Sequence, residues 1–280
     1  MSNTVLITGA STGFGKLTAQ RFQAAGWNVI ATMRSPQKEA ELTGLPNVLV
    51  CRLDVTDQGS IDAAVAEGVE RFGGINAVVN NAGFGMVGLF EEASEEEFTR
   101  QFDTNVFGVI RVTQAVLPYM RRQRRGVVVN VSSIGGLVGM PASSLYCSTK
   151  FALEGLTESM AHELSAFGVR AYTVSPGAFK TQFLDSVQIY EGRDVPDLKA
   201  AHEVLYEHLQ KWMDSPPKPF RFGDPQKVAE RVFQCVTRQP NKTIHPVGQD
   251  ARLILWLKGL LGRNRVLKMI RRTGFPELAY

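Results

Sequence analysis

Short apolar runs alternate with helical patterns along most of the chain. The runs that we expect to form strands are residues 4–8, 27–32, 47–53, 76–79, 126–131, 169–175 and 242–247. They are nearly continuous apolar stretches rather than alternations of apolar and polar residues, which is typical of strands buried on both faces. With the helices between them, they predict an α/β fold in which helices cover both faces of a parallel sheet.

Some of the expected helices carry clear boundary signals. Ser94 and Glu97 form a capping box at the start of a long helix. Pro118 should kink or end this helix, because a proline inside a helix removes a backbone hydrogen bond. Another helix is expected from residue 143 or 144 to about residue 167. Its core stripe is predicted to be Leu145, Ala152, Leu156, Met160 and Leu164.

The first strand leads directly into a glycine-rich turn, Gly9-Ala-Ser-Thr-Gly13-Phe-Gly15, and then into a helix. This order is the layout of a dinucleotide-binding unit. Glycines let backbone N–H groups approach a pyrophosphate at the helix N-terminus, where the helix dipole favours negative charge. The turn alone is also consistent with a plain tight turn, but its place between the first strand and the first helix favours cofactor binding.

The residues after the second strand indicate which dinucleotide is bound. An acidic residue there would bind the ribose hydroxyls, whereas an arginine would accept a 2′-phosphate. Met33 stands where the acid would be expected, Arg34 follows it, and the next carboxylate is Glu39. The pattern favours NADP(H). NAD(H) stays an alternative, because Arg34 is also consistent with a solvated loop cation.

The stretch from Asn130 to Lys150 holds the residues that favour chemistry. Tyr146 and Lys150 are four residues apart in an expected helix, so they share a face, and Ser133 follows the fifth strand at its carboxyl end. A buried lysine beside the phenol would lower the pKa of the phenol from about 10, so that it could exchange a proton with an alcohol or carbonyl. The same spacing is common in ordinary helices, so the prediction depends on the other motifs.

Six motifs occur together in the order and at the spacing of a known family. They are Thr8-Gly9-x-x-x-Gly13-x-Gly15, Asn80-Asn81-Ala82-Gly83, Asn105, Ser133, Tyr146-x-x-x-Lys150 and Pro176-Gly177. Together they resemble the short-chain dehydrogenase/reductase family over nearly the whole chain. The run Tyr146-Cys-Ser-Thr-Lys150 and the segment Pro246-Val-Gly248-Gln-Asp250-Ala251 are most similar to the 17β-hydroxysteroid and retinol dehydrogenase-like branch.

The resemblance implies a fold and a domain organisation. The expected fold is a Rossmann-type, doubly wound, seven-stranded parallel sheet with helices on both faces, in a single domain over residues 1–280. The cofactor half would cover about residues 1–130, and the catalytic and substrate half about residues 131–247. Members of the family are often joined into homodimers or homotetramers through the helix that bears the tyrosine.

The resemblance also implies the catalytic roles. Tyr146 would be the acid/base and Ser133 would orient the substrate oxygen. Lys150 would bind the nicotinamide ribose and tune the phenol. Asn105 would hold a water that connects Lys150 to solvent, which would explain an asparagine inside a helix, although a tolerated polar residue explains it equally well. The implied reaction is hydride transfer between the nicotinamide and a carbonyl or alcohol carbon.

The cofactor-binding residues implied by the resemblance are spread along the chain. Asp54 would bind the adenine and Thr181 the nicotinamide carboxamide. The full set is Gly9, Ser11, Thr12, Gly13, Phe14, Gly15, Arg34, Asp54, Val55, Asn81, Ala82, Gly83, Tyr146, Lys150, Pro176, Gly177, Phe179 and Thr181. A non-catalytic NADP(H)-binding sensor or scaffold is the rival interpretation. The intact Ser-Tyr-Lys-Asn set argues against it, because a sensor needs only the cofactor half.

In this family the segment corresponding to residues 183–222 folds over the substrate. Here it carries the large apolar residues Leu184, Val187, Ile189, Tyr190, Leu198, Leu205, Tyr206, Leu209, Trp212 and Met213. They favour a bulky apolar alcohol or ketone, with the loop 84–90 as the facing wall. An equally weighted alternative is that these residues only pack the lid onto the body of the protein.

Bulk properties add little evidence for another class of protein. The net charge is +4, but residues 250–280 alone hold seven Lys and Arg against two acidic residues, so the remainder is close to neutral. The basic helical tail, about residues 249–272, is expected to pack on the body or on a partner subunit. Contact with an anionic membrane is the less favoured alternative.

Three scattered cysteines fit a reducing compartment, and the four histidines lack metal-ligand spacing. No signal peptide is visible, no apolar run reaches the roughly 20 residues that span a bilayer, and no motif points to nucleic acid. We therefore expect a soluble cytoplasmic protein that acts on a small molecule, without a metal site.

Overall fold

The computed structural model describes residues 2–214 and 222–274. Its centre is a seven-stranded parallel sheet in the order β3-β2-β1-β4-β6-β7-β9. The strands are β1 (Thr4–Ile7), β2 (Asn28–Met33), β3 (Val48–Arg52), β4 (Ala77–Asn80), β6 (Gly126–Val131), β7 (Val169–Pro176) and β9 (Ile244–Val247). The predicted seven-stranded parallel sheet is therefore confirmed. Its strand order reverses between β1 and β4, where ligands bind in folds of this type.

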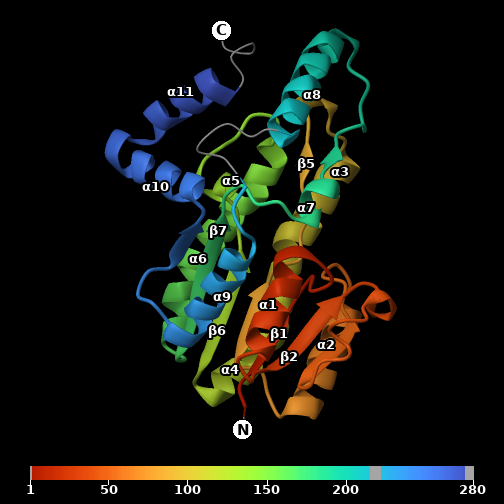
Figure 1. The fold of residues 1–280 in the computed structure, drawn as a ribbon, viewed down its shortest axis with the longest axis vertical. Coiled ribbons are helices and arrows are strands. Elements are labelled where there is room, and N and C mark those ends of the chain that lie inside the picture. Colours follow the sequence, from red (N-terminus) through yellow and green to blue (C-terminus); the bar gives the residue numbers. More distant parts are fainter. Residues whose placement is uncertain (1, 215–221, 275–280) are drawn as a thin grey trace.

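Successive residues of each strand point to opposite faces of the sheet, and each face has its own apolar core. Val5 and Ile7 of β1 belong to a core that includes residues of α1 (Gly13–Gln23) and α9 (Gln226–Arg238). Leu6, between them, belongs to a core on the other face. That second core includes residues of α2 (Gln58–Phe72), α4 (Gly108–Gln123) and α6 (Ser144–Ser165). Helices thus cover both faces, as Figure 1 shows.

The long helix predicted after Ser94 is a chain of three helical segments. It consists of α3 (Glu95–Phe102), a π-helical turn η3 (Asp103–Phe107) and α4. The capping box is confirmed, since the Ser94 hydroxyl accepts from the Glu97 amide at 3.3 Å and the Glu97 carboxylate accepts from the Ser94 amide at 2.9 Å. Of the two outcomes expected at Pro118, a kink or an end of the helix, the end is wrong. The helix continues to Gln123 because its buried stripe extends past the proline to Met120.

The core stripe predicted for α6 is only partly correct. Leu145 and Leu164 are buried, but Ala152, Leu156 and Met160 are half-buried. The side of α6 that is buried most completely carries polar residues instead, including Lys150, Glu154 and Thr157. A pattern of apolar residues does not predict this face, because its buried side chains are polar and form hydrogen bonds with the neighbouring strands.

Several short elements and one longer helix, α8 (Lys199–Asp214), lie beyond the carboxyl ends of the strands. The short elements are η1 (Pro36–Lys38), β5 (Met86–Val87), η2 (Phe90–Glu92), α5 (Ile134–Leu137), α7 (Gln182–Asp185), β8 (Gln188–Ile189) and η4 (Pro196–Leu198). Strands β5 and β8 form a small parallel sheet of their own, which joins the loop 84–90 to the lid. Residues 215–221 of the predicted lid, and the side chains of Leu209, Trp212 and Met213, lie outside the described residues.

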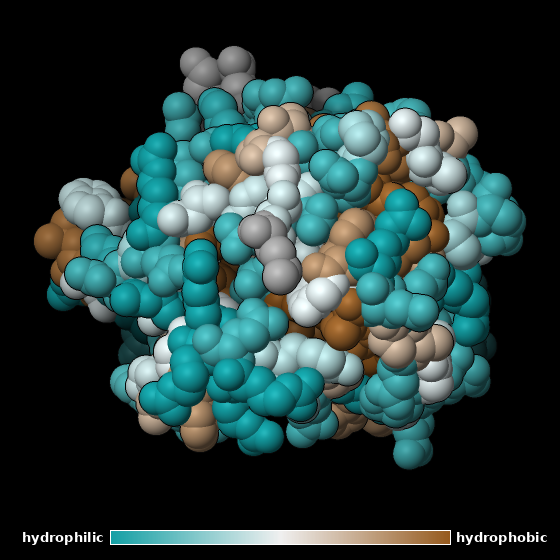
Figure 2. All heavy atoms as spheres, turned by 90° about the horizontal axis from the view of Figure 1, so that it is seen from below, coloured by the Kyte–Doolittle hydropathy of each residue, from teal (hydrophilic) through white to brown (hydrophobic). Residues whose placement is uncertain are grey.

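The chain continues into two helices, α10 (Gln249–Leu261) and α11 (Arg263–Gly274). They lie with α8 beyond the end of the sheet that is opposite the N-terminus (Figure 1). The face seen from the N-terminal end carries mostly hydrophilic residues with smaller hydrophobic areas between them (Figure 2). Across the described residues, no helix combines the length and the apolar character that crossing a membrane requires.

Candidate active site

A cavity of about 710 Å³ lies where the central strands end. Residues that follow four neighbouring strands line it, including Gly9 after β1, Asn81 after β4, Ser133 after β6 and Gly177 after β7. Because the carboxyl ends of parallel strands meet at one edge, the chain brings these distant residues together. The volume lies in the range of small-molecule and cofactor sites.

The glycine-rich turn is held against the end of β4. The Asn81 side chain donates to the carbonyl oxygens of Thr8 at 3.0 Å and Gly9 at 3.1 Å, and the Thr8 hydroxyl accepts from the amides of Asn81 and Ala82, each at 3.0 Å. A Cβ atom on Gly15 would overlap the Gly9 carbonyl oxygen, so only glycine allows this approach.

The first turn of α1 is suited to an anion. The Thr12 side chain does not cap this helix, and the first turn carries no acidic residue. Its first amide groups therefore have no capping side chain at Thr12, and the helix dipole adds positive potential there. Ser11, Thr12, Gly13 and Phe14 all line the cavity. This cradle fits a pyrophosphate.

The end of β2 presents a cation to the cavity. Arg34 lines the cavity and is exposed, whereas Met33 before it is buried. Glu39 is engaged elsewhere, since it pairs with Lys16 at 3.3 Å and accepts from the Leu42 amide at 3.0 Å. Although burial acts to raise the pKa of Glu39, these hydrogen bonds hold it below its ordinary value. The carboxylate is therefore ionised and already paired.

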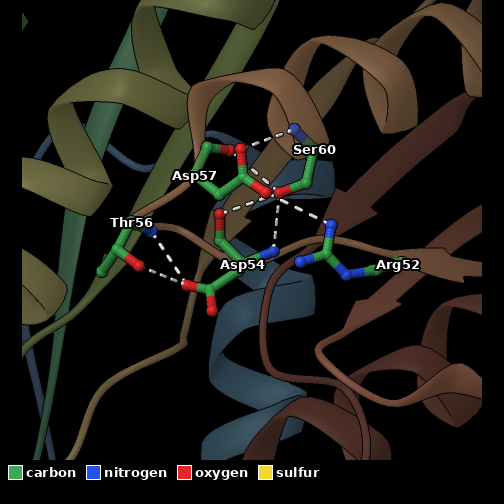
Figure 3. Close-up of polar contacts among 5 residues, drawn as sticks. All are labelled: Arg52, Asp54, Thr56, Asp57 and Ser60. Carbon is green, nitrogen blue, oxygen red and sulfur yellow. Dashed lines mark hydrogen bonds and ion pairs between the residues drawn. The ribbon is translucent and has the colours of Figure 1, made fainter.

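Asp54 lies just beyond β3 in a network of hydrogen bonds (Figure 3). Its Oδ1 accepts from the Thr56 amide at 3.0 Å and the Thr56 hydroxyl at 2.8 Å, while its own amide donates to the Ser60 hydroxyl at 2.9 Å. Asp57 caps α2 through the Ser60 amide and pairs with Arg52 at 3.2 Å. Burial acts to raise the pKa of Asp54, but the bonds from Thr56 hold it below the ordinary value. Oδ2 accepts no hydrogen bond from any described residue, so it can accept one from a ligand.

Ser133, Tyr146 and Lys150 line the same cavity. Ser133 caps α5, its hydroxyl accepting from the Gly135 amide at 3.1 Å. The Lys150 ammonium lies 5.7 Å from the centre of the Tyr146 ring and donates to the carbonyl oxygen of Val131 at 3.0 Å. The predicted serine, tyrosine and lysine are therefore brought together.

Burial dominates the acid–base properties of this group. It raises the pKa of Tyr146 to about 12, against the effect of a hydrogen bond with Ser133. It lowers the pKa of Lys150 to about 8, which the negative charge of Glu154 partly opposes. The expected lowering of the phenol pKa by Lys150 is thus not found. The loss of water around the phenol outweighs the effect of nearby groups.

Asn105 lies one layer behind the cavity, in the π-helical turn. Its amide donates to the Phe84 carbonyl at 2.9 Å, and its side-chain oxygen accepts from the Phe84 amide at 3.1 Å. A contact of 3.3 Å joins it to the Thr149 hydroxyl. Asn105 therefore fixes the loop that follows β4. Of the predicted site residues, Asn105 and Gly15 are the two that do not line the cavity.

The cavity also has an apolar wall, which comes largely from the two segments predicted to face the substrate, loop 84–90 and the lid 183–222. Apolar side chains on its wall are Phe84, Val87, Met140, Phe183, Leu184 and Val187. Tyr190 and Leu205 are instead buried, and Tyr190 packs with Met86 and Leu145 in a small core. The lid residues thus divide between lining the cavity and packing onto the body.

Two polar residues of the cavity wall are not among the predicted site residues. Arg100 donates to Gln188 of the lid at 2.6 Å. Asp250 accepts from the Ala178 amide at 2.6 Å, and a Cβ on Gly177 would overlap its carboxylate. Asp250 stands in the segment that resembles the 17β-hydroxysteroid and retinol dehydrogenase-like branch, but no local pattern connects it to the Pro176-Gly177 turn. Among the described residues, histidine, cysteine and acidic side chains form no cluster that could hold a metal ion.

Comparison with known proteins gives close relatives of matching length. A family model described as short chain dehydrogenase matches residues 3–191. An uncharacterized oxidoreductase, YusZ, of Bacillus subtilis is 38% identical over 263 residues, covering 91% of this chain and 92% of the relative. A 3-ketodihydrosphingosine reductase of Bacteroides thetaiotaomicron is 39% identical, covering 84% of both chains. Human 17-beta-hydroxysteroid dehydrogenase type 1 is 33% identical, covering 86% of this chain and 75% of the relative.

Solved structures of other proteins also match this chain. A short-chain dehydrogenase from Streptomyces avermitilis superposes over 100% of both chains with a TM-score of 0.81 and 33% identity. ElxO, solved with NADP bound, has a TM-score of 0.74 and 29% identity, covering 88% of this chain and 97% of its own. A 3-ketoacyl-(acyl-carrier-protein) reductase from Brucella melitensis, solved with NADH, has a TM-score of 0.74 and 28% identity, covering 88% and 96%. With the parallel sheet and the glycine-rich turn, these matches establish that the chain belongs to the short-chain dehydrogenase/reductase family of oxidoreductases.

Proposed function

We propose that the protein transfers a hydride between NADP(H) and the carbonyl or alcohol carbon of a bulky apolar substrate. The observation that carries this proposal is that Ser133, Tyr146 and Lys150 share one cavity with the glycine-rich turn. A cofactor held by that turn would extend toward the tyrosine. The bound nicotinamide would supply or accept the hydride, and the protein would supply position and proton transfer.

Different residues of the cavity would bind different parts of the cofactor. The first turn of α1 would hold the pyrophosphate and Asp54 the adenine end, with Val55 beside it. Asn81, Ala82 and Gly83 would line the middle of the cofactor, and Pro176, Gly177, Phe179 and Thr181 would support the nicotinamide end. Gly15 would act indirectly, by allowing α1 to approach Gly9.

Tyr146 would give its proton to the substrate oxygen while Ser133 holds that oxygen. Because burial raises the pKa of Tyr146 to about 12, the phenol is neutral near pH 7 and is a proton donor. This state suits reduction of a carbonyl. Lys150 would hold the ribose. Asn105 would act through the loop that it fixes and, as the resemblance implies, through a water between Lys150 and solvent.

Arg34 supports NADP(H) over NAD(H). Arg34 lines the cavity, and the following carboxylate, Glu39, is paired with Lys16. An arginine in this place suits a 2′-phosphate. Among the solved neighbours, ElxO holds NADP and the Brucella melitensis reductase holds NADH. We expect Arg34→Ala to weaken NADPH binding by about tenfold or more, the value of one charge-assisted contact, and to change NADH binding little. Tighter binding of NADH than NADPH to the unaltered protein would contradict the assignment.

The apolar part of the cavity supports a large hydrophobic substrate. Its wall includes Phe84, Met140, Phe183, Leu184 and Val187, and the hydrogen-bonded pair Arg100 and Gln188 also lines the cavity. Two of the relatives are named for a sphingoid ketone and for a hydroxysteroid, which are bulky apolar compounds. Small polar ketones would leave this wall in contact with water.

The test is NADPH consumption with a panel of long-chain, cyclic and small polar ketones. We expect turnover of the bulky apolar members and a loss of at least about a hundredfold in Tyr146→Phe, because the variant lacks the proton donor. NADPH binding, measured by fluorescence, should be nearly unchanged in that variant. If both proteins bind NADPH equally and neither reduces any ketone, the protein is a cofactor-binding sensor instead.

A further inference from the structure

Helices α10 and α11 have one side packed on the body and the other open. Ala251, Ile254 and Val266 are buried, and they form a core with Ile134 and Val138 beside the cavity. This packing agrees with the prediction that the basic tail lies on the body. It accounts for only the inner side of the two helices.

The outer side of α10 is apolar. Leu253, Trp256 and Leu260 are 36%, 61% and 63% exposed. Their spacing of three and four residues places them on one face of the helix. Single exposed apolar residues are ordinary, but a row that includes a tryptophan is not. Such a row indicates a surface that another apolar phase covers.

Most of the exposed cations of the two helices are on α11. Residues 251–274 contain no acidic residue, and their cations are Arg252, Lys258, Arg263, Arg265, Lys268, Arg271 and Arg272. Lys258 donates to the Leu137 carbonyl, and Arg263 lies over the Phe151 ring. Of the others, none forms an ion pair with a described acidic residue, and all are exposed.

We propose that the outer face of α10 and α11 docks on an anionic lipid bilayer. Trp256 and Leu260 would enter the boundary between headgroups and acyl chains, and the cations of α11 would lie against anionic headgroups. A second copy of the chain fits this face poorly. A two-fold contact would bring the uncompensated cations of both copies together, which is unfavourable.

The docked face is connected to the cavity. Met140 packs against the core under α10 and also lines the cavity. Asp250, in the first turn of α10, lines the cavity as well. Docking would therefore hold the apolar part of the cavity near the membrane. The docking proposal itself does not depend on the reaction, because its test uses no substrate.

Flotation with vesicles tests the electrostatic half of the proposal. We expect the full chain to float with vesicles of phosphatidylcholine mixed with phosphatidylglycerol at low salt, and not with phosphatidylcholine alone. The double variant Arg265→Glu and Lys268→Glu should bind the mixed vesicles at least about tenfold more weakly. The matched control, Arg121→Glu and Arg122→Glu, reverses two exposed cations at the end of α4 and should bind like the unaltered protein.

Brominated acyl chains test the apolar half. They should quench part of the tryptophan fluorescence on mixed vesicles, and Trp256→Phe should abolish that quenching. The pair Trp256→Ser and Leu260→Ser should weaken vesicle binding by about tenfold or more. An unchanged affinity for NADPH in every variant would show that the variants are folded. Failure to bind mixed vesicles, equal loss in the α4 control, or self-association that the Trp256 and Leu260 variant abolishes would overturn the proposal.

Discussion

Lys150 is a buried cation whose charged state costs stability. The negative charge of Glu154, one turn farther along α6, opposes this cost. The Glu154 carboxylate also accepts from the hydroxyls of Thr173 at 2.7 Å and Ser175 at 2.8 Å. Such a cost is retained where function requires a charge, as at a site that must hold ribose beside a phenol.

The first prediction is that Lys150→Met is more stable than the unaltered protein at pH 7 and loses this advantage at high pH. The folded-state pKa of about 8 lies below the ordinary 10.5, so the unfolded chain binds more protons between these values. The stability of the unaltered protein therefore rises with pH in this window, by about 3 kcal/mol in all. Denaturant unfolding from pH 7 to 10.5 measures the difference. If the free energy of unfolding changed with pH in the same way in both proteins, the lowered pKa of Lys150 would be contradicted.

At the scale of elements, a buried row of amides and hydroxyls ties the centre of the sheet to helices on one face. Asn80 and Asn130 are partners in the β4–β6 register, and the Asn80 amide donates to the Asn130 side-chain oxygen at 2.8 Å. The Asn80 amide also donates to Thr113 of α4, and the Asn130 amide to Thr157 of α6. A shift in register would leave these buried groups without partners, so the row specifies one alignment.

Asn130→Ala should therefore lower the free energy of unfolding by about 2–4 kcal/mol, because it leaves the Asn80 amide and the Thr157 hydroxyl with one partner fewer. Asn28→Ala is the matched control on another strand. Its amide makes only a 3.4 Å contact with Thr4, in a half-buried place, so we expect a loss below about 1 kcal/mol. Equal losses in both variants would show that the buried row carries no special stability.

Sequence patterns predict the strands of the main sheet well, because each is a continuous apolar run between turn signals. The same patterns predict the structure less well where polar groups are buried or where the residues in contact are far apart in the sequence. The buried side of α6 carries Lys150 and Glu154, so an apolar stripe misplaces it. The π-helical turn at Asn105 and the β5–β8 pair leave no periodic signal. Asp250 meets Gly177 only after the chain has folded.

On the scale of the whole molecule, the lid is attached to the body by polar contacts from α3 and the segment before it. Glu97 accepts from the Glu191 amide at 3.0 Å, and Arg100 donates to Gln188 at 2.6 Å. Glu92 contacts His202 of α8 at 2.8 Å. These contacts hold the wall of the cavity that would face the substrate, while the cofactor cradle lies on other elements.

Glu97→Ala should accordingly raise KM for bulky ketones by about three- to tenfold, the loss expected for one or two hydrogen bonds, and leave NADPH affinity unchanged. Steady-state kinetics at saturating NADPH measures the first quantity and fluorescence titration the second. The control Glu95→Ala changes a neighbouring exposed carboxylate that makes no contact with the lid among the described residues. An equal rise of KM in the Glu95→Ala control would show that loss of the lid contact does not cause the change.

The most direct test of hydride transfer follows the hydrogen itself. NADPH carrying deuterium at the transferable position of C4 is incubated with the protein and the best bulky ketone of the panel, and the alcohol is analysed by mass spectrometry and NMR. We predict one deuterium on the carbinol carbon, formed by the unaltered protein and strongly reduced in Tyr146→Phe. Alcohol without deuterium, or equal labelled product from both proteins, would contradict hydride transfer with Tyr146 as the acid.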